Sequence, residues 1–146
     1  MADDDVLPDP ARVRIARRIE WMDTDAGGIW HWTTVFRLAE AAEAALHAAL
    51  GIPPAETFGV CPRVAVSATF SKSLRFDDAV EAELAVESLG RSSLAYRLVV
   101  FSDGEPAAEG SLKVVFVDRR TRKAVPWPSG IREKLAGGGL VEERPR

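Results

Sequence analysis

Residues 33–50 are the stretch that most restricts how this chain can fold. Their polar residues recur at intervals of 3, 3 and 4, at Arg37, Glu40, Glu43 and His47. This spacing predicts an α-helix with one narrow polar stripe, because almost every other residue is Ala, Leu, Val or Phe. A surface helix usually has a single apolar stripe, so we expect this helix to be mostly enclosed by other structure. Gly51 and the Pro53-Pro54 pair predict where it ends.

Five segments alternate apolar and polar residues, as half-buried strands do. One precedes the helix and four follow it, at residues 12–21, 64–70, 80–86, 94–100 and 112–116. Asp103-Gly104, between the last two, is typical of a tight reverse turn. Consecutive strands with short turns pair antiparallel, and such a sheet has one dry face for a helix to cover. The sequence therefore predicts an α+β fold in which a curled antiparallel sheet of about five strands wraps a long central helix.

The chain is long enough for one hydrophobic core but not for two. Its length is 146 residues, and we expect a single domain over residues 13–136. Residues 1–12 contain two prolines and residues 137–146 begin with three glycines. Both segments are predicted to be flexible ends.

Charge and cysteine content exclude several classes of protein. The 19 Lys and Arg residues against 22 Asp and Glu give a net charge of −3, which provides no basic face for nucleic acid. No apolar run approaches the roughly 20 residues of a membrane-spanning helix, and the acidic start is unlike a signal peptide. With Cys61 as the one cysteine, an intrachain disulfide and a cysteine zinc cage are impossible. We expect a cytoplasmic protein without a metal.

The loop at residues 21–32, between the first strand and the helix, carries the most chemistry. It contains Asp23, Asp25 and the pair Gly27-Gly28. Glycines let a ligand approach the main chain, and the helix that follows presents unpaired N–H groups and a positive dipole end. A carboxylate there stays ionised, which suits a nucleophile or a general base. Spacing alone leaves a second interpretation open, in which both aspartates merely stabilise the turn or cap the helix.

The run Asp23-Thr24-Asp25-Ala26-Gly27-Gly28, with Trp21 before it and Glu40 after it, resembles the signature of the 4-hydroxybenzoyl-CoA thioesterase-like acyl-CoA thioesterases. Shorter matches extend the resemblance over about residues 14–128, at Gly51-Ile52-Pro53-Pro54, Pro62, Phe76-Asp77-Asp78 and Gly90-Arg91-Ser92-Ser93. This family has the hotdog fold, a long helix wrapped by an antiparallel sheet. The resemblance implies that fold and the hydrolysis of an acyl-CoA thioester.

The resemblance also implies roles for individual residues. The catalytic carboxylate corresponds to Asp25, which either attacks the thioester carbonyl or activates a water that does. Backbone N–H groups at a helix N-terminus stabilise the oxyanion, and the matching donor lies near Val60 or Cys61. Active sites of the family form between subunits, which implies a homodimer or homotetramer whose site combines Asp25 and the donor from different chains. No cofactor is implied, because CoA is part of the substrate, and Asp23 takes a supporting or turn role.

Two positions depart from the family pattern. Many relatives carry His or Tyr where this chain has Trp32, whose indole cannot accept a proton. Either His31, one residue earlier, replaces that group from a shifted angle, or Asp25 acts without it. Glu40 matches the family, but Ala41 follows it where relatives often carry Arg. Glu40 therefore has either a solvated or interface role on the polar stripe or a supporting role in catalysis.

The resemblance suggests how the substrate binds. Trp30, Trp32 and Phe36 either belong to the core or line an acyl pocket, which would favour an aromatic or medium-length acyl group. The turn of Arg91, Ser92 and Ser93 matches the loop of the family that contacts CoA, and Arg suits phosphate, although an exposed Arg is often simply solvated. Lys72 and Arg75 are weaker candidates for phosphate ligands. We interpret the basic run 119–123 as a solvated turn. Cys61 has no base partner near it in sequence, and we interpret it as a small buried hydrophobe.

Three functions are compatible with these residues. The first is an acyl-CoA thioesterase. The second is a hotdog enzyme resembling enoyl-CoA hydratases, whose pattern has four residues between Asp and His where this chain has five between Asp25 and His31. The third is an acyl-CoA-binding module without catalysis, which Trp32 keeps open. The sequence leaves undecided the acyl group, CoA or acyl carrier protein as its carrier, and two or four subunits.

Overall fold

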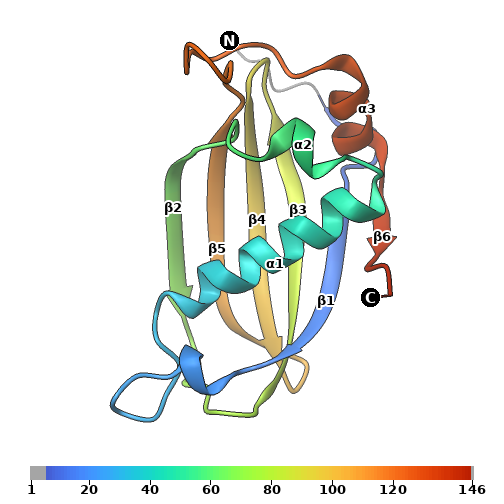
Figure 1. The fold of residues 1–146 in the computed structure, drawn as a ribbon. Coiled ribbons are helices and arrows are strands. Elements are labelled where there is room, and N and C mark those ends of the chain that lie inside the picture. The colour runs from blue at the N-terminus through green and yellow to red at the C-terminus, as the bar shows by residue number, and fades with distance from the viewer. Residues whose placement is uncertain (1–5, 146) are drawn as a thin grey trace.

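The computed structural model describes residues 6–145 and confirms the predicted architecture, a long helix lying across a curled sheet (Figure 1). The strands are β1 (Arg12–Arg18), β2 (Arg63–Phe70), β3 (Ala79–Leu89), β4 (Ser93–Ser102), β5 (Glu105–Val115) and β6 (Leu140–Glu142). The helices are α1 (Thr34–Ala49), α2 (Pro54–Thr57) and α3 (Ser129–Gly137), with a short 3-10 turn, η1 (Trp21–Asp23), before α1.

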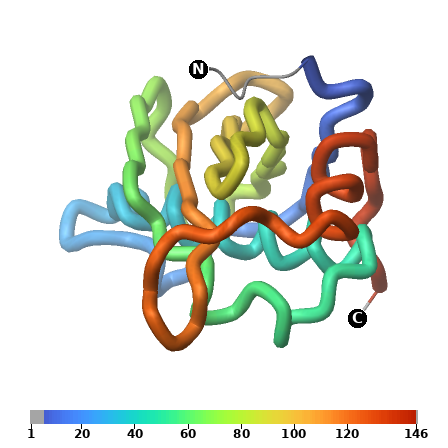
Figure 2. The backbone as a smooth tube through the Cα atoms, turned by 90° about the horizontal axis from the view of Figure 1, so that it is seen from above, coloured from blue at the N-terminus to red at the C-terminus, as the bar shows by residue number. Residues whose placement is uncertain are grey.

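The sheet has six strands in the order β2-β5-β4-β3-β1-β6. Neighbours pair antiparallel, except that β6 runs parallel to β1. Viewed along the strands, the sheet is curved and α1 crosses one side of it (Figure 2). The turn at Asp103-Gly104 has φ angles of 53° and 76°, as expected for the tight hairpin between β4 and β5.

The hydrophobic core lies between α1 and the inner face of the sheet. Alternate residues of the central strands point inward and are buried, as their period of two predicted. The central-strand core residues are Val80, Ala82, Leu84, Val86, Leu94, Tyr96, Leu98 and Val100, and α1 contributes Val35, Leu38, Ala42 and Leu46. No helix among residues 6–145 is both long and apolar enough to cross a membrane.

The helix is less enclosed than its composition indicated. It packs over β1, β3 and β6, and Ala44 and Ala48 on its opposite side are exposed. The inner face of β2 is also uncovered, since Val66 is 50% exposed and Phe70 is 44% exposed. One protomer therefore leaves an apolar strip open along α1 and the edge strand β2.

The ends of the chain are more ordered than predicted. Residues 1–5 lie outside the described part, but the backbone N–H of Ala11 donates to the carbonyl of Leu135 at 2.9 Å. The expected flexible tail instead forms β6, and Gly139 exchanges hydrogen bonds of 2.9 Å with Asp9 and Arg12. The edge of β1 has backbone groups that need partners, and the tail supplies them. Gly139 makes this possible because its φ of 63° suits glycine.

Candidate active site

The loop before α1 folds back on itself and presents Asp25 at its tip. Thr24 and Trp30 form an isolated bridge, the N–H of Asp25 donates to the carbonyl of Ile29 at 2.8 Å, and Gly28 donates to the carbonyl of Asp25 at 3.0 Å. Gly28 has a φ of 81°, which a residue with a side chain rarely adopts. The second glycine of the motif is therefore required by the shape of this turn.

The carboxylate of Asp25 is exposed at the mouth of a cavity. Its Oδ1 accepts the N–H of Gly27 at 2.8 Å, so a local turn orients the side chain and leaves the other oxygen open. The cavity has a volume of about 430 Å³ and is called here the Asp25 cavity. Its lining comprises Asp25, Ile29, Trp30, Trp32, Phe70, Ser71, Lys72 and Ser73.

Asp23 has the opposite environment although it is only two residues away. It is 3% exposed, and its two oxygens accept from Nε and Nη2 of Arg37 at 2.6 and 2.5 Å. The same carboxylate accepts the N–H of Glu20 at 2.8 Å, and its carbonyl accepts Oγ1 of Thr34 at 2.8 Å. The hydrogen bond to Asp23 raises the pKa of Arg37. These contacts fit the turn and supporting role expected for Asp23.

His31 and Trp32 separate at the start of α1. Nδ1 of His31 accepts the N–H of Thr33 at 3.2 Å and lies 2.7 Å from its Oγ1, so the imidazole is engaged at its own helix terminus. Trp32 is 62% exposed, lines the Asp25 cavity and meets Phe36 edge to face with ring centroids 6.4 Å apart. Of the three aromatic residues proposed for the acyl pocket, Trp30 and Trp32 line this cavity, and Phe36 packs against the core.

The far wall of the Asp25 cavity comes from Phe70 at the end of β2 and from residues 71–73 after it, of which the sequence had singled out only Lys72, as a weak phosphate ligand. Nε1 of Trp30 donates to the carbonyl of Lys72 at 3.2 Å, and the ring of Trp30 meets Phe70 edge to face at 5.6 Å. Nζ of Lys72 pairs with Glu105 at 3.1 Å, so its charge is already balanced. The available signal for this wall was Trp30, a buried tryptophan of the motif, but the strand that Trp30 contacts lies forty residues further along the chain.

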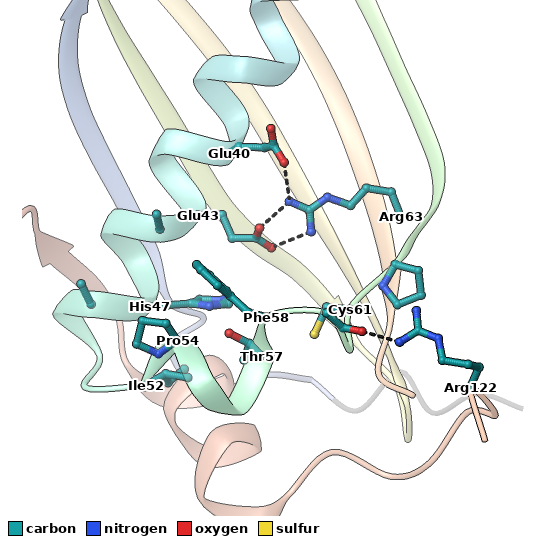
Figure 3. A pocket seen from close by; sticks show the side chains of 14 residues that line it. Glu40, Glu43, His47, Ile52, Pro54, Thr57, Phe58, Cys61, Arg63 and Arg122 are labelled. Atoms are coloured by element: carbon teal, nitrogen blue, oxygen red, sulfur yellow. Dashed lines mark hydrogen bonds and ion pairs between the residues drawn. The ribbon is translucent and has the colours of Figure 1, made fainter. Parts of the chain in front are cut away.

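A second cavity, of about 620 Å³, lies along the C-terminal half of α1 (Figure 3). Glu40 and Cys61 line this cavity and not the Asp25 cavity. The N–H of Val60 donates to the carbonyl of Thr57 at 3.3 Å, so Val60 is not free to bind an oxyanion. Burial raises the pKa of Cys61 to about 11, in agreement with a thiol that is not a nucleophile.

Three members of the polar stripe of α1, Glu40, Glu43 and His47, line this second cavity. They have partners that sequence patterns did not reveal. Glu43 accepts from Nη1 and Nη2 of Arg63 at 3.2 and 2.5 Å, and Glu40 lies 3.9 Å from the same guanidinium. Nε2 of His47 lies 3.1 Å from the hydroxyl of the buried Tyr96. We call this second cavity the Glu43–Arg63 cavity.

The turn at Gly90–Ser93 lies at the end of the sheet opposite the 21–32 loop (Figure 1). The side chain of Arg91 is exposed, and the carbonyls of Arg91 and Ser92 accept the N–H groups of Trp127 at 2.9 Å and Phe116 at 2.7 Å. The carbonyl of Ser93 accepts Nε1 of Trp127 at 3.0 Å. Within the basic run 119–123, Arg119 and Arg122 donate to carbonyls of residues 55–59. Within one chain, the residues expected to bind CoA are therefore far from Asp25.

Comparison with known proteins places these features in context. A family model described as the thioesterase-like superfamily matches residues 19–135. A 1,4-dihydroxy-2-naphthoyl-CoA hydrolase from Prochlorococcus marinus (strain MIT 9303) is 29% identical over 86% of this chain and 91% of its own.

Solved structures of thioesterases have the same hotdog fold. A gentisyl-coenzyme A thioesterase superposes with a TM-score of 0.75 at 25% identity, over 85% of this chain and 99% of its own. A 4-hydroxybenzoyl-CoA thioesterase superposes with a TM-score of 0.75 at 21% identity, over 87% and 99%. At such low identity the second likeness concerns the fold alone.

Proposed function

The chain belongs to the thioesterase-like superfamily, and from this membership we propose that it hydrolyses an acyl-CoA thioester to a free acid and CoA. One observation carries the choice of the reacting group. Asp25 is an exposed carboxylate that accepts a single backbone N–H and lines a cavity with aromatic walls, in the loop that leads into a long helix. The other carboxylate of the motif, Asp23, is fully occupied by Arg37 and Glu20.

Two routes are consistent with this geometry. In the first, an oxygen of Asp25 attacks the thioester carbon, the C–S bond breaks, CoA leaves as the thiolate, and water hydrolyses the acyl-aspartate anhydride. In the second, Asp25 removes a proton from water as the water attacks, and the proton passes to the departing sulfur. Nδ1 of His31 is turned toward Thr33, and we propose that Asp25 acts without His31 in either route.

The oxyanion needs N–H donors close to Asp25. The N–H groups on either side of Trp32 are engaged, since His31 donates to the carbonyl of Asp23 at 2.6 Å and Thr33 to Nδ1 of His31 at 3.2 Å. Trp32 lines the same cavity as Asp25, and we propose its N–H as a donor at the positive end of α1. Cys61 is able to contribute only from a second copy, because it lines the other cavity.

We propose that the enzyme is a dimer joined through β2. Within residues 6–145 this strand pairs on one side only, with β5. Its residues 64–70 contain neither a charge nor a proline, the features that usually protect an edge strand from pairing. An identical strand can add antiparallel about a two-fold axis and cover Val66 and Phe70.

Val66→Lys tests this interface. Val66 is 50% exposed in the protomer, so a lysine there should change the free energy of unfolding by less than about 0.5 kcal/mol. In a dimer, both copies of this lysine would be buried beside the two-fold axis. We therefore expect Val66→Lys to be monomeric by analytical ultracentrifugation. Ser111→Lys, on the neighbouring interior strand, is the control. A dimer that survives Val66→Lys would contradict pairing through β2.

The proposed substrates are aromatic acyl-CoA thioesters. Trp30, Trp32 and Phe70 supply aromatic walls beside Asp25, and such rings stack on a planar acyl group. The names of the similar proteins point the same way, since two of them act on hydroxylated aromatic acyl-CoA compounds. For the CoA phosphates we propose the turn of Arg91, Ser92 and Ser93, provided by a second copy.

Free thiol release from a panel of acyl-CoA thioesters tests the reaction. For Asp25→Asn we expect kcat/KM to fall by about 10³-fold, because loss of a general base or nucleophile has effects of this order. Asp78→Asn is a matched control, since this carboxylate also accepts a backbone N–H at 2.8 Å in a turn. Unchanged thiol release in Asp25→Asn would refute the proposal. Hydration of an enoyl-CoA, or binding without turnover, would instead select a hydratase or a binding module.

A further inference from the structure

The loop that presents Asp25 is closed at its base by Asp23. The backbone carbonyl of Asp23 accepts the N–H of His31 at 2.6 Å and Oγ1 of Thr34 at 2.8 Å. Both ends of the loop are therefore tied to one residue, with Asp25 between them. Because His31 and Thr34 flank Trp32, the same contacts fix the start of α1, where we propose the oxyanion donor.

Arg37 of α1 holds the side chain of Asp23 in place. Its Nε and Nη2 donate to the two carboxylate oxygens at 2.6 and 2.5 Å, and such a two-point contact fixes the plane of a carboxylate as well as its distance. Asp23 is 3% exposed, so without its cation this carboxylate would have to move or bind a proton. Arg37 does not line the Asp25 cavity. Its effect on the reaction therefore passes through Asp23.

A second guanidinium, that of Arg17, lies near this ion pair. Arg17 continues the inward side of β1, on which Val13 and Ile15 are buried, and its side chain is 21% exposed. The helix α1 packs over β1, which brings Arg17 toward Arg37. The hydrogen bond to Asp23 raises the pKa of Arg37, whereas burial and the positive charge of Arg17 oppose that rise.

The C-terminal segment supplies the carboxylate that balances Arg17. The strand β6 runs beside β1 (Figure 1), and Glu143 is the residue that follows β6. Its two oxygens accept from Nη1 and Nη2 of Arg17 at 2.9 and 2.5 Å. Both residues lie outside residues 19–135, the part of the chain that matches the family model. The charge balance next to Arg37 therefore depends on segments beyond that match.

Each guanidinium has a carboxylate of its own. Asp23 pairs with Arg37, and Glu143 pairs with Arg17. Without Glu143, two like charges would stand near one buried carboxylate, and like charges repel strongly in a partly buried site. Arg17 would then compete with Arg37 for Asp23, and the base of the loop would lose its fixed geometry. A displacement of about 1 Å at a reacting group is sufficient to slow a reaction by up to about 100-fold.

We propose that Arg37 is a positioning residue for the reaction at Asp25. Glu143 supports this role from the C-terminal segment by neutralising Arg17. Arg37 fixes Asp23, Asp23 closes the loop, and the closed loop sets the position of Asp25 relative to the N-terminus of α1. The inference rests on the proposed function and adds to it the residues that hold the reacting group in place.

Arg37→Lys tests the positioning role. Lysine keeps a positive charge beside Asp23, so the chain folds, but one ammonium group cannot reproduce the two-point contact. The substrate is benzoyl-CoA or another acyl-CoA thioester that the wild type hydrolyses faster. We expect kcat for each folded molecule to fall about tenfold while KM stays within about twofold. Near-UV circular dichroism gives the folded fraction, and a kcat within about twofold of the wild type would overturn the inference.

A rescue experiment tests the support from the C-terminal segment. Glu143→Gln removes one charge with little change of shape, and we expect kcat to fall about threefold. Arg17→Met/Glu143→Gln also removes the stranded guanidinium, and kcat should return to within about 1.5-fold of the wild type. A role in stability alone predicts no such return, because the double variant loses the whole ion pair. An unchanged kcat in Glu143→Gln, or a double variant that is no faster than Glu143→Gln, contradicts the inference.

The control is an ion pair on the outer face of the sheet. Nε and Nη2 of Arg14 donate to Glu83 at 3.1 and 2.7 Å, and Arg14→Met/Glu83→Gln should leave kcat and KM unchanged. If Asp25→Asn abolishes thiol release while Arg37→Lys and Glu143→Gln keep the kcat of the wild type, the proposed function stands and only this inference fails. If the wild type releases no thiol from any acyl-CoA thioester, the proposed function fails and the inference fails with it.

Discussion

The Asp25 cavity and the Glu43–Arg63 cavity lie toward opposite ends of β2, and the carboxylates that line them have different hydrogen-bond partners. Asp25 has one backbone N–H as a partner and an open face, whereas Glu43 is held by two bonds from a guanidinium. A carboxylate that must react has to keep a free oxygen, and a carboxylate that shapes a pocket must be neutralised because it is partly buried. The two carboxylates therefore differ in their number of partners: Asp25 keeps an oxygen free, as its proposed role requires, and Glu43 does not.

The largest expected effect comes from replacing each of the two aspartates of the motif by alanine, in separate variants. Asp23→Ala leaves the guanidinium of Arg37 and the N–H of Glu20 without their acceptor, and we expect the free energy of unfolding to fall by about 3 kcal/mol. Asp25→Ala loses only one exposed hydrogen bond and should cost less than about 1 kcal/mol. Urea unfolding measures both, and equal losses would contradict the different roles assigned to them.

The Glu43–Arg63 pair provides the next test. Arg63→Met leaves Glu43, which is 15% exposed, without its cation, and the free energy of unfolding should fall by about 2 kcal/mol. Adding Glu43→Leu removes the stranded charge and should restore most of that loss. Urea unfolding measures both variants. A double variant less stable than Arg63→Met would show that the pair stabilises the fold by something other than neutralising the charge of Glu43.

The smallest effect concerns pH. Burial lowers the pKa of His47, so below about pH 6.5 the unfolded chain binds more protons at this residue than the folded chain does. The free energy of unfolding should therefore fall as the pH drops below that value, by at most about 1.4 kcal/mol per pH unit from this residue. His47→Gln should flatten this slope between pH 6.5 and 5. The second histidine, His31, serves as control in His31→Gln, and a slope that depends on His31 alone would refute the assignment.

Local patterns were sufficient for most of the fold. The helix at Thr34–Ala49, the strands β1 to β5 and the turn at Asp103-Gly104 follow from periodicity and turn chemistry that operate within a few residues. The strand β6 was not foreseen, because three residues carry no readable period and gain their order from the free edge of β1. The open side of α1 was also missed, since composition indicates that a face must be covered without indicating whether its own chain covers it.

The motif alone identified Asp25 as the carboxylate to examine, because spacing, glycines and the helix start are all properties of neighbours along the chain. Other features of the site depend on contacts between distant segments. These contacts decide which aspartate stays open and bring Arg63 to Glu43. They also place Lys72 and Phe70 in the wall opposite Trp30. Such contacts arise when the curled sheet brings those segments against α1, and their energies come from burial and pairing that no short stretch of sequence contains.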